Sequence, residues 1–233
     1  MTARPSALAL AALVASLPLA LGGRSAAADP SCPPSEMSFG GSTPFTTTVG
    51  VFDTSGTIGY GDFHVAYDLP AGTAFMHQFY LRDITYVRAS DAFDLMGVPP
   101  GTRVDLTVEC TVTGAVYTPK CAASGCWGIF GDRLSSGPYA DERKHSINLF
   151  DGRREFTDVL QIPLSIVAGS PERIDVTLYG YNLGGGNHGV EGTSQLRFIT
   201  ADPAVTVVSC QGYAMAPVPV RPTTWGRLKA IYR

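Results

Sequence analysis

The sequence predicts an all-β protein, an antiparallel β-sandwich of the jelly-roll type. Apolar and polar residues alternate with a period of two in several stretches, and turns that contain Gly and Pro separate those stretches. Patterns with a helical period are scarce after the first 28 residues. Strands without interleaved helices favour two antiparallel sheets packed face to face, with a closed barrel as the second choice.

The N-terminus has the layout of a secretory signal peptide. Arg4 precedes an apolar run over 7–21, which is followed by a stretch of small residues at 26–28. The run contains Pro18 and is shorter than the roughly 20 apolar residues that a spanning helix needs. We therefore expect cleavage after residue 28 and an extracellular or cell-surface protein.

Two strands stand out, one over 103–113, "RVDLTVECTVT", and one over 172–181, "ERIDVTLYGY". In both, every second residue is apolar, which places one face of the strand in a core and the other in water. The turn sequences "LPAGT", "VPPGT", "AGSPE" and "LGGGNHG" lie between the strands. Further strands are predicted around 45–51, 63–67, 75–87, 156–162, 195–199 and 205–208.

The domain organisation follows from the absence of repeats and linkers in the strand-rich part. After a signal peptide over 1–28, we expect one β-sandwich domain over 29–214. Residues 215–233 then form a Pro-rich spacer and a basic, aromatic C-terminal tail.

Five cysteines follow the expected cleavage site, and an exported protein favours disulfides. Cys32 and Cys210 lie near the two ends of the domain, which are often close in space, so we expect them to pair. Cys121 and Cys126 flank a short loop that can close on itself, and Cys110 points into the core. The C-x4-C spacing is a poor zinc pattern, so no metal site is predicted.

The charge balance excludes one class of partner. Two of the 17 basic residues lie in the leader, which leaves 15 basic against 20 acidic residues, a formal charge of −5. Without the tail the body has 11 basic residues and a charge of −9. Such a body repels nucleic acid and anionic membranes, so no nucleic-acid partner is expected.

Motifs for catalysis and cofactor binding are missing. The sequence has no G-x-S-x-G elbow and no H-E-x-x-H pair, and its G-x-G-x-x-G at 184–189 does not open a helix. We predict no catalytic residue and no cofactor, and therefore no enzyme. A carboxylate pair such as Asp91 with Asp94 keeps a glycoside hydrolase as the third choice.

Tyr179 and Tyr181 are candidates for stacking against a sugar. Their two-residue spacing exposes both rings on the face opposite Leu178. This pair makes a carbohydrate-binding module the alternative function.

The stretches "LMGVPPGTRVDLTVECTVTG", "DVLQIPLSIVAGSPERIDVTLYGY" and "TSQLRFI" resemble the ectodomains of exported bacterial β-sandwich proteins of the PEP-CTERM and choice-of-anchor type. The resemblance covers the second half of the chain after the leader, and it implies a secreted or cell-surface role without catalytic residues. The C-terminal sorting tail departs from that pattern, because the apolar helix of the PEP-CTERM proteins is missing.

The tail "RPTTWGRLKAIYR" is interpreted as a recognition segment for export or surface-attachment machinery. A weak interfacial anchor and a frayed terminus are the alternatives. The residues that we expect to be recognised are Trp225, Arg227, Leu228, Lys229, Tyr232 and Arg233. From these observations we expect a secreted or cell-surface structural and interaction protein.

Overall fold

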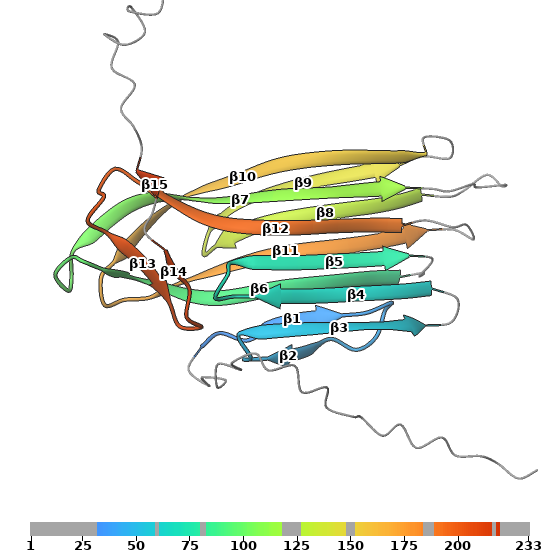
Figure 1. Cartoon of the computed structure of the whole chain (residues 1–233), viewed down its shortest axis with the longest axis horizontal. Helices are drawn as coiled ribbons and strands as arrows, with labels where there is room; N and C mark the ends of the chain where they lie inside the picture. The colour runs from blue at the N-terminus through green and yellow to red at the C-terminus, as the bar shows by residue number, and fades with distance from the viewer. Residues whose placement is uncertain are drawn as a thin grey trace, which may run out of the picture.

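The protein is a β-sandwich, as predicted. The computed structural model describes residues 32–58, 61–79, 83–117, 127–147, 152–183, 189–215 and 218–219. Two sheets pack face to face without closing into a barrel, and the described residues form no helix (Figure 1).

The first sheet, here called the β6 sheet, has the strand order β14-β13-β6-β11-β8-β9. The short strand β1 also pairs with β6, and β2 pairs with β1. All these pairs are antiparallel. The strands are β1 (Ser35–Ser38), β2 (Phe45–Thr47), β6 (Asp83–Met96), β8 (Trp127–Ser136), β9 (Tyr139–Ile147), β11 (Glu172–Leu183), β13 (Thr206–Ser209) and β14 (Ala214–Met215).

The second sheet, the β7 sheet, has the order β10-β7-β12-β5-β4-β3, and the two-residue strand β15 pairs in parallel with the end of β12. Consecutive strands β9 and β10 therefore end up in different sheets, each at an edge. The strands are β3 (Val51–Ile58), β4 (Gly61–Asp68), β5 (Thr73–Phe79), β7 (Arg103–Tyr117), β10 (Arg153–Val167), β12 (Gly189–Thr200) and β15 (Val218–Pro219).

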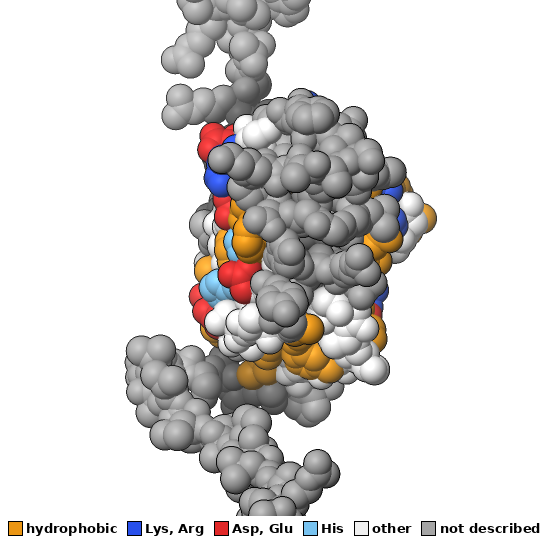
Figure 2. All heavy atoms as spheres, turned by 90° about the vertical axis from the view of Figure 1, so that its right-hand side faces the viewer, with side chains coloured by type: hydrophobic (Ala, Val, Ile, Leu, Met, Phe, Trp, Pro, Cys, Tyr) orange, Lys and Arg blue, Asp and Glu red, His pale blue; other side chains and the backbone are white. Residues whose placement is uncertain are grey.

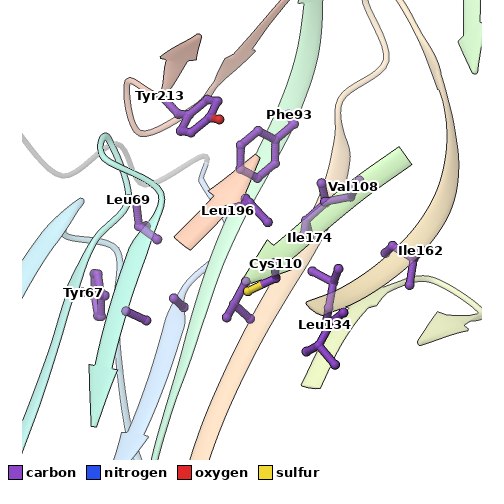
Figure 3. Close-up of a cluster of buried hydrophobic side chains, with 14 of the residues drawn as sticks. Tyr67, Leu69, Phe93, Val108, Cys110, Leu134, Ile162, Ile174, Leu196 and Tyr213 are labelled. Atoms are coloured by element: carbon purple, nitrogen blue, oxygen red, sulfur yellow. The ribbon is translucent and has the colours of Figure 1, made fainter. Parts of the chain in front are cut away.

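The core lies between the sheets and is built from every second residue of each strand. In β7 the even-numbered residues Leu106, Val108 and Val112 are buried, while Arg103 and Thr113 are exposed. Figure 3 shows residues of both sheets meeting in this layer. At one end, the rings of Phe93, Phe198 and Tyr213 pack with centroids 5.0 to 5.6 Å apart. The alternation read from the sequence is thus the alternation of buried and exposed faces.

The strands predicted over 103–113 and 172–181 are confirmed, and both extend further than predicted. The single strand predicted over 75–87 is wrong, because β5 ends at Phe79 in one sheet and β6 begins at Asp83 in the other. The alternation of apolar and polar residues continues from β5 into β6 because both strands turn one face to the same core. The predicted strand at 45–51 likewise covers β2 and only the start of β3.

Five strands were not predicted: β1, β8 and β9, and the two-residue strands β14 and β15. Strand β9, "YADERKHSI", is mostly polar, and β8 has Asp132 at an inward-facing position between two apolar ones. Neither β8 nor β9 shows the strict alternation of apolar and polar residues that is typical of a half-buried strand. The structure forms both because they pair with each other and with β11.

The predicted pairing of Cys32 with Cys210 is confirmed. The Cα atoms are 5.7 Å apart, and the bond joins residues separated by 178 positions. Cys110 is a free thiol with no exposed surface. Burial, as the main cause, raises the pKa of Cys110 to about 12, so this thiol stays protonated and unreactive at neutral pH. Cys121 and Cys126 lie outside the described residues.

The expected signal peptide and the six tail residues that we expect to be recognised also lie outside the described part of the chain. Strand pairing nevertheless reaches into the expected spacer: Met215 pairs with Val207, and Val218 and Pro219 run beside the end of β12. Within the residues that the structure describes, no helix has the length and apolarity to cross a membrane.

Removal of the Cys32–Cys210 disulfide tests how much this bond contributes to the stability of the fold. In the chain-entropy model a closed loop of this size stabilises the native state by about 4 to 5 kcal/mol, and measured losses run from about 2 to 5 kcal/mol. We expect Cys32→Ser with Cys210→Ser to lower the free energy of unfolding by this amount in denaturant titrations. Cys110→Ala, which leaves the disulfide intact, is the comparison, and equal midpoints for wild type and the double variant would contradict the prediction.

Candidate functional site

A large hollow of the described surface lies on the outer face of the β7 sheet. Its volume is about 600 Å³, and residues of the four neighbouring strands β10, β7, β12 and β5 line it. Most of the lining residues have odd numbers and alternate along their strands with residues that face the core. The lining consists of Phe75, Thr113, Gly114, Arg153, Glu155, Phe156, Thr157, Glu191, Gly192 and Thr193.

A second hollow of about 240 Å³ continues the first toward β4 and β3. The two share Phe75 and Thr193, and the second adds Asp53 and Asp68. Together they cross six neighbouring strands, which at the usual spacing of about 4.8 Å between strands corresponds to roughly 24 Å. We call this depression the outer groove.

Charged side chains on this face are paired with one another. Arg153 donates hydrogen bonds to Glu191 at 2.7 Å and to Glu155 at 3.2 Å. The ring of His77 lies 3.5 Å from the carboxylate of Glu191. Further along, His64 and Asp53 are 2.7 Å apart. Figure 2 shows acidic, basic and histidine side chains gathered along the left-hand side of the molecule in that view. The face therefore offers both hydrogen-bond donors and acceptors.

Aromatic rings lie beside these charges. The guanidinium of Arg153 lies 5.5 Å from the centre of the Tyr117 ring, which in turn stacks on Phe79. Tyr117 lies flat because its cross-strand partner is Gly189, where a Cβ atom would approach the ring to 2.0 Å. Phe75 lies between the two hollows and contacts the edge of the His64 ring.

The predicted stacking residues Tyr179 and Tyr181 lie on the opposite side of the molecule, on the outer face of the β6 sheet. They share one face of β11, as their spacing predicts, but neither lines the outer groove. Tyr179 covers Gly131, its cross-strand partner, and donates a hydrogen bond to Glu142 at 3.1 Å. Its ring is thus engaged in packing within the sheet.

Asp91 and Asp94, the carboxylate pair that the sequence offered, point to opposite faces of β6. Asp91 is inward and 2% exposed, and it accepts hydrogen bonds from the backbone N–H groups of Ala92 and Gln211. Asp94 is on the outer face and accepts from the backbone N–H of Gly169. The two carboxyl groups therefore do not flank a common space.

The sequence did not point to the groove residues, because isolated Thr, Glu and Arg residues on the wet face of a strand carry no motif. It also did not point to a cluster of Asp132, His145 and Asp158, whose ligand atoms lie within 4.8 Å of one another. The hints were two acids that alternate with apolar residues, Asp132 on β8 and Asp158 on β10. Both groups depend on which strands become neighbours.

Comparisons with known proteins add no assignment: the chain matches no protein-family model and no curated protein sequence. The resemblance to PEP-CTERM and choice-of-anchor ectodomains stays a prediction.

Asp91 makes stability depend on pH. Burial raises its pKa from 3.8 to about 6, although hydrogen bonds from Ser209, Ala92 and Gln211 oppose the shift. Because the folded pKa exceeds the unfolded one, the charged carboxylate disfavours the fold. This penalty is absent below about pH 4, grows as the pH rises through the folded pKa, and reaches about 3 kcal/mol by pH 7.

We expect Asp91→Asn to gain stability relative to wild type by up to about 3 kcal/mol between pH 4 and pH 7, because the amide cannot ionise. Denaturant titrations of both proteins at several pH values measure this difference. A difference that stays constant over the range would show that Asp91 does not titrate in this way.

Proposed function

We propose that the protein is a non-catalytic, exported interaction protein that binds a carbohydrate chain in the outer groove. The observation that carries the proposal is an open, polar depression across six strands of one sheet, with aromatic rings beside paired charges. This proposal joins the expected interaction role to the carbohydrate-binding alternative, and it moves the binding surface from Tyr179 and Tyr181 to the β7 sheet.

The residues that line the outer groove suit a ligand that carries many hydroxyl groups. Thr113, Thr157 and Thr193 contribute hydroxyls that donate and accept hydrogen bonds. Arg153 and Glu191 add a charged donor and a charged acceptor close together. Charge-assisted hydrogen bonds of this kind are stronger than neutral ones. The apolar face of a sugar ring can pack on Phe75.

The shape and the charge argue against other ligand classes. Deep sites for small molecules enclose most of the ligand surface, whereas this groove is open to solvent. The larger hollow contains one basic and two acidic residues, so it has no excess of positive charge for phosphate or nucleic acid. An extended, neutral oligosaccharide fits both properties.

Export and the recognition of the tail remain parts of this proposal. The expected signal peptide and the disulfide support an oxidising compartment. The basic tail, with its aromatic residues, is the segment that we propose as the contact with export or surface-attachment machinery.

A matched pair of variants tests the binding face. Thr193→Glu places a carboxylate in the outer groove, whereas Thr177→Glu makes the same change on β11, on the outer face that carries Tyr179. Both positions face away from the core, so each change should alter stability by less than about 0.5 kcal/mol. We expect the wild type and Thr177→Glu to bind the same members of a polysaccharide and oligosaccharide panel, and Thr193→Glu to lose at least about tenfold in affinity.

If Thr177→Glu lost affinity and Thr193→Glu kept it, the binding site would lie on the β6 sheet. That result would support Tyr179 and Tyr181 as the residues that stack against the sugar. Absence of binding across the panel, with folded protein verified by near-ultraviolet circular dichroism, would end the carbohydrate proposal. Hydrolysis of a bound polysaccharide would contradict the non-catalytic part.

The intact mass of the protein recovered from host surface and medium tests export and processing. We expect a mature chain that begins at Asp29, together with an altered mass at 221–233 if the tail is a sorting signal. Masses before and after reduction and alkylation count the disulfides. A species that retains residues 1–28 would contradict export, and an unmodified end at Arg233 would contradict processing of the tail.

A further inference from the structure

Three strands bring Asp132, His145 and Asp158 together at the edge of the sandwich where β9 and β10 lie. Asp132 is on β8, His145 on the adjacent strand β9, and Asp158 on β10 of the opposite sheet. Asp132 and Asp158 lie on the faces of β8 and β10 that carry the buried Leu134 and Leu160, and His145 pairs across from the buried Phe130. One ligand atom of each residue lies within 4.8 Å of the others.

Asp132 is the unusual member of this cluster. Its side chain has no exposed surface, and neither carboxylate oxygen has a hydrogen-bond partner among the described residues. Such a carboxylate costs the fold free energy unless a positive charge or a proton satisfies it. One carboxylate oxygen of Asp132 lies within 4.8 Å of a ligand atom of His145 and of Asp158, so a cation bound there can reach all three residues.

The charges around the cluster leave Asp132 uncompensated. Arg143 is its cross-strand neighbour on β9, but the guanidinium bonds Asp141 and is 48% exposed. The carboxylate of Asp158 lies beside that of Asp132. Two carboxylates at this distance repel when both are ionised, and a bound cation removes that repulsion.

The imidazole of His145 is held in position. Its ring stacks on Phe156 with centroids 3.9 Å apart and planes 8° from parallel, and Nε2 contacts Asp158. Phe156 in turn lies over Gly114, its cross-strand partner on β7, where a Cβ atom would come within 2.5 Å of the ring. The side chain of His145 is 17% exposed and that of Asp158 is 14% exposed, which leaves an approach from solvent.

We propose that Asp132, His145 and Asp158 form a binding site for a divalent transition-metal ion, with zinc as the best match. One imidazole nitrogen and two carboxylate groups are ordinary zinc ligands, and three protein ligands leave one position for water. Calcium and magnesium prefer oxygen ligands alone, so the histidine argues against them. The ion links β8 and β9 to β10 and thereby joins the two sheets at this edge. Binding of the ion does not depend on the proposed carbohydrate binding.

Zinc titration of the full chain after treatment with chelator tests the site. We expect uptake of one zinc ion that Asp132→Asn weakens by at least about 100-fold, since it removes one of three ligands. His145→Gln and Asp158→Asn are expected to do the same. At a zinc concentration about 100 times the Kd, the melting temperature of the wild type should rise by about 5 to 10 °C. That rise should be absent in Asp132→Asn.

Two controls distinguish zinc bound by this cluster from zinc bound elsewhere on the protein. Asp132→Asn retains all five cysteines, so zinc held by thiols remains in this variant and is separated from zinc held by the cluster. The variant also removes an uncompensated buried charge, so we expect it to fold, and near-ultraviolet circular dichroism verifies this. Asp53→Asn is the matched control, because Asp53 and His64 form a similar pair that is 69% and 40% exposed on the outer face.

The proposal is overturned if the wild type takes up no zinc at concentrations up to about 1 mM, which corresponds to a negligible affinity. It is also overturned if Asp132→Asn and wild type bind zinc equally, or if Asp53→Asn removes binding as well. In the first case, a proton shared within the cluster satisfies Asp132 in place of a metal ion.

Discussion

The burial of the inner faces of the two sheets against each other is the interaction on which the rest of the structure depends. Residues such as Val108, Leu134 and Ile174 have almost no exposed surface, and they come from both sheets. Apolar burial stabilises a protein by about 25 cal/mol per Å², and no single strand can bury its apolar face alone. The outer faces are free to be polar because the inner faces meet this requirement, and the outer groove lies on such a face.

The interior becomes polar at the edge of the sandwich where β9 and β10 lie. Position 132 alternates with Phe130 and Leu134 on β8, and position 158 precedes the buried Leu160 on β10 by two residues. Apolar residues at positions 132 and 158 would fill the space between the sheets at a lower free-energy cost, because buried charges are unfavourable unless they are satisfied. Two acids and a histidine at the inward-facing positions of three strands therefore indicate a ligand, whereas packing alone does not explain them.

Glycines opposite aromatic residues shape both outer faces. Tyr117 lies over Gly189 in the β7 sheet, and Tyr179 lies over Gly131 in the β6 sheet. In each pair, the glycine lets the ring lie flat on the neighbouring strand, which protects the exposed backbone of the glycine. The same arrangement has different consequences on the two sides. Tyr117 lies beside Arg153 next to the outer groove, whereas Tyr179 is held by Glu142 and does not line that groove.

The sequence by itself determined the fold class, the buried and exposed faces of the clearest strands, and the pairing of Cys32 with Cys210. These features follow from local alternation and from the position of the cysteines near the domain ends. Only the tertiary structure decided which strands are neighbours, that β5 and β6 belong to different sheets, and that β8 and β9 are strands at all. The outer groove and the cluster of Asp132, His145 and Asp158 each combine residues of at least three strands. A period of two specifies which way a side chain points, but sheet membership and register depend on long-range packing, which the local pattern does not encode.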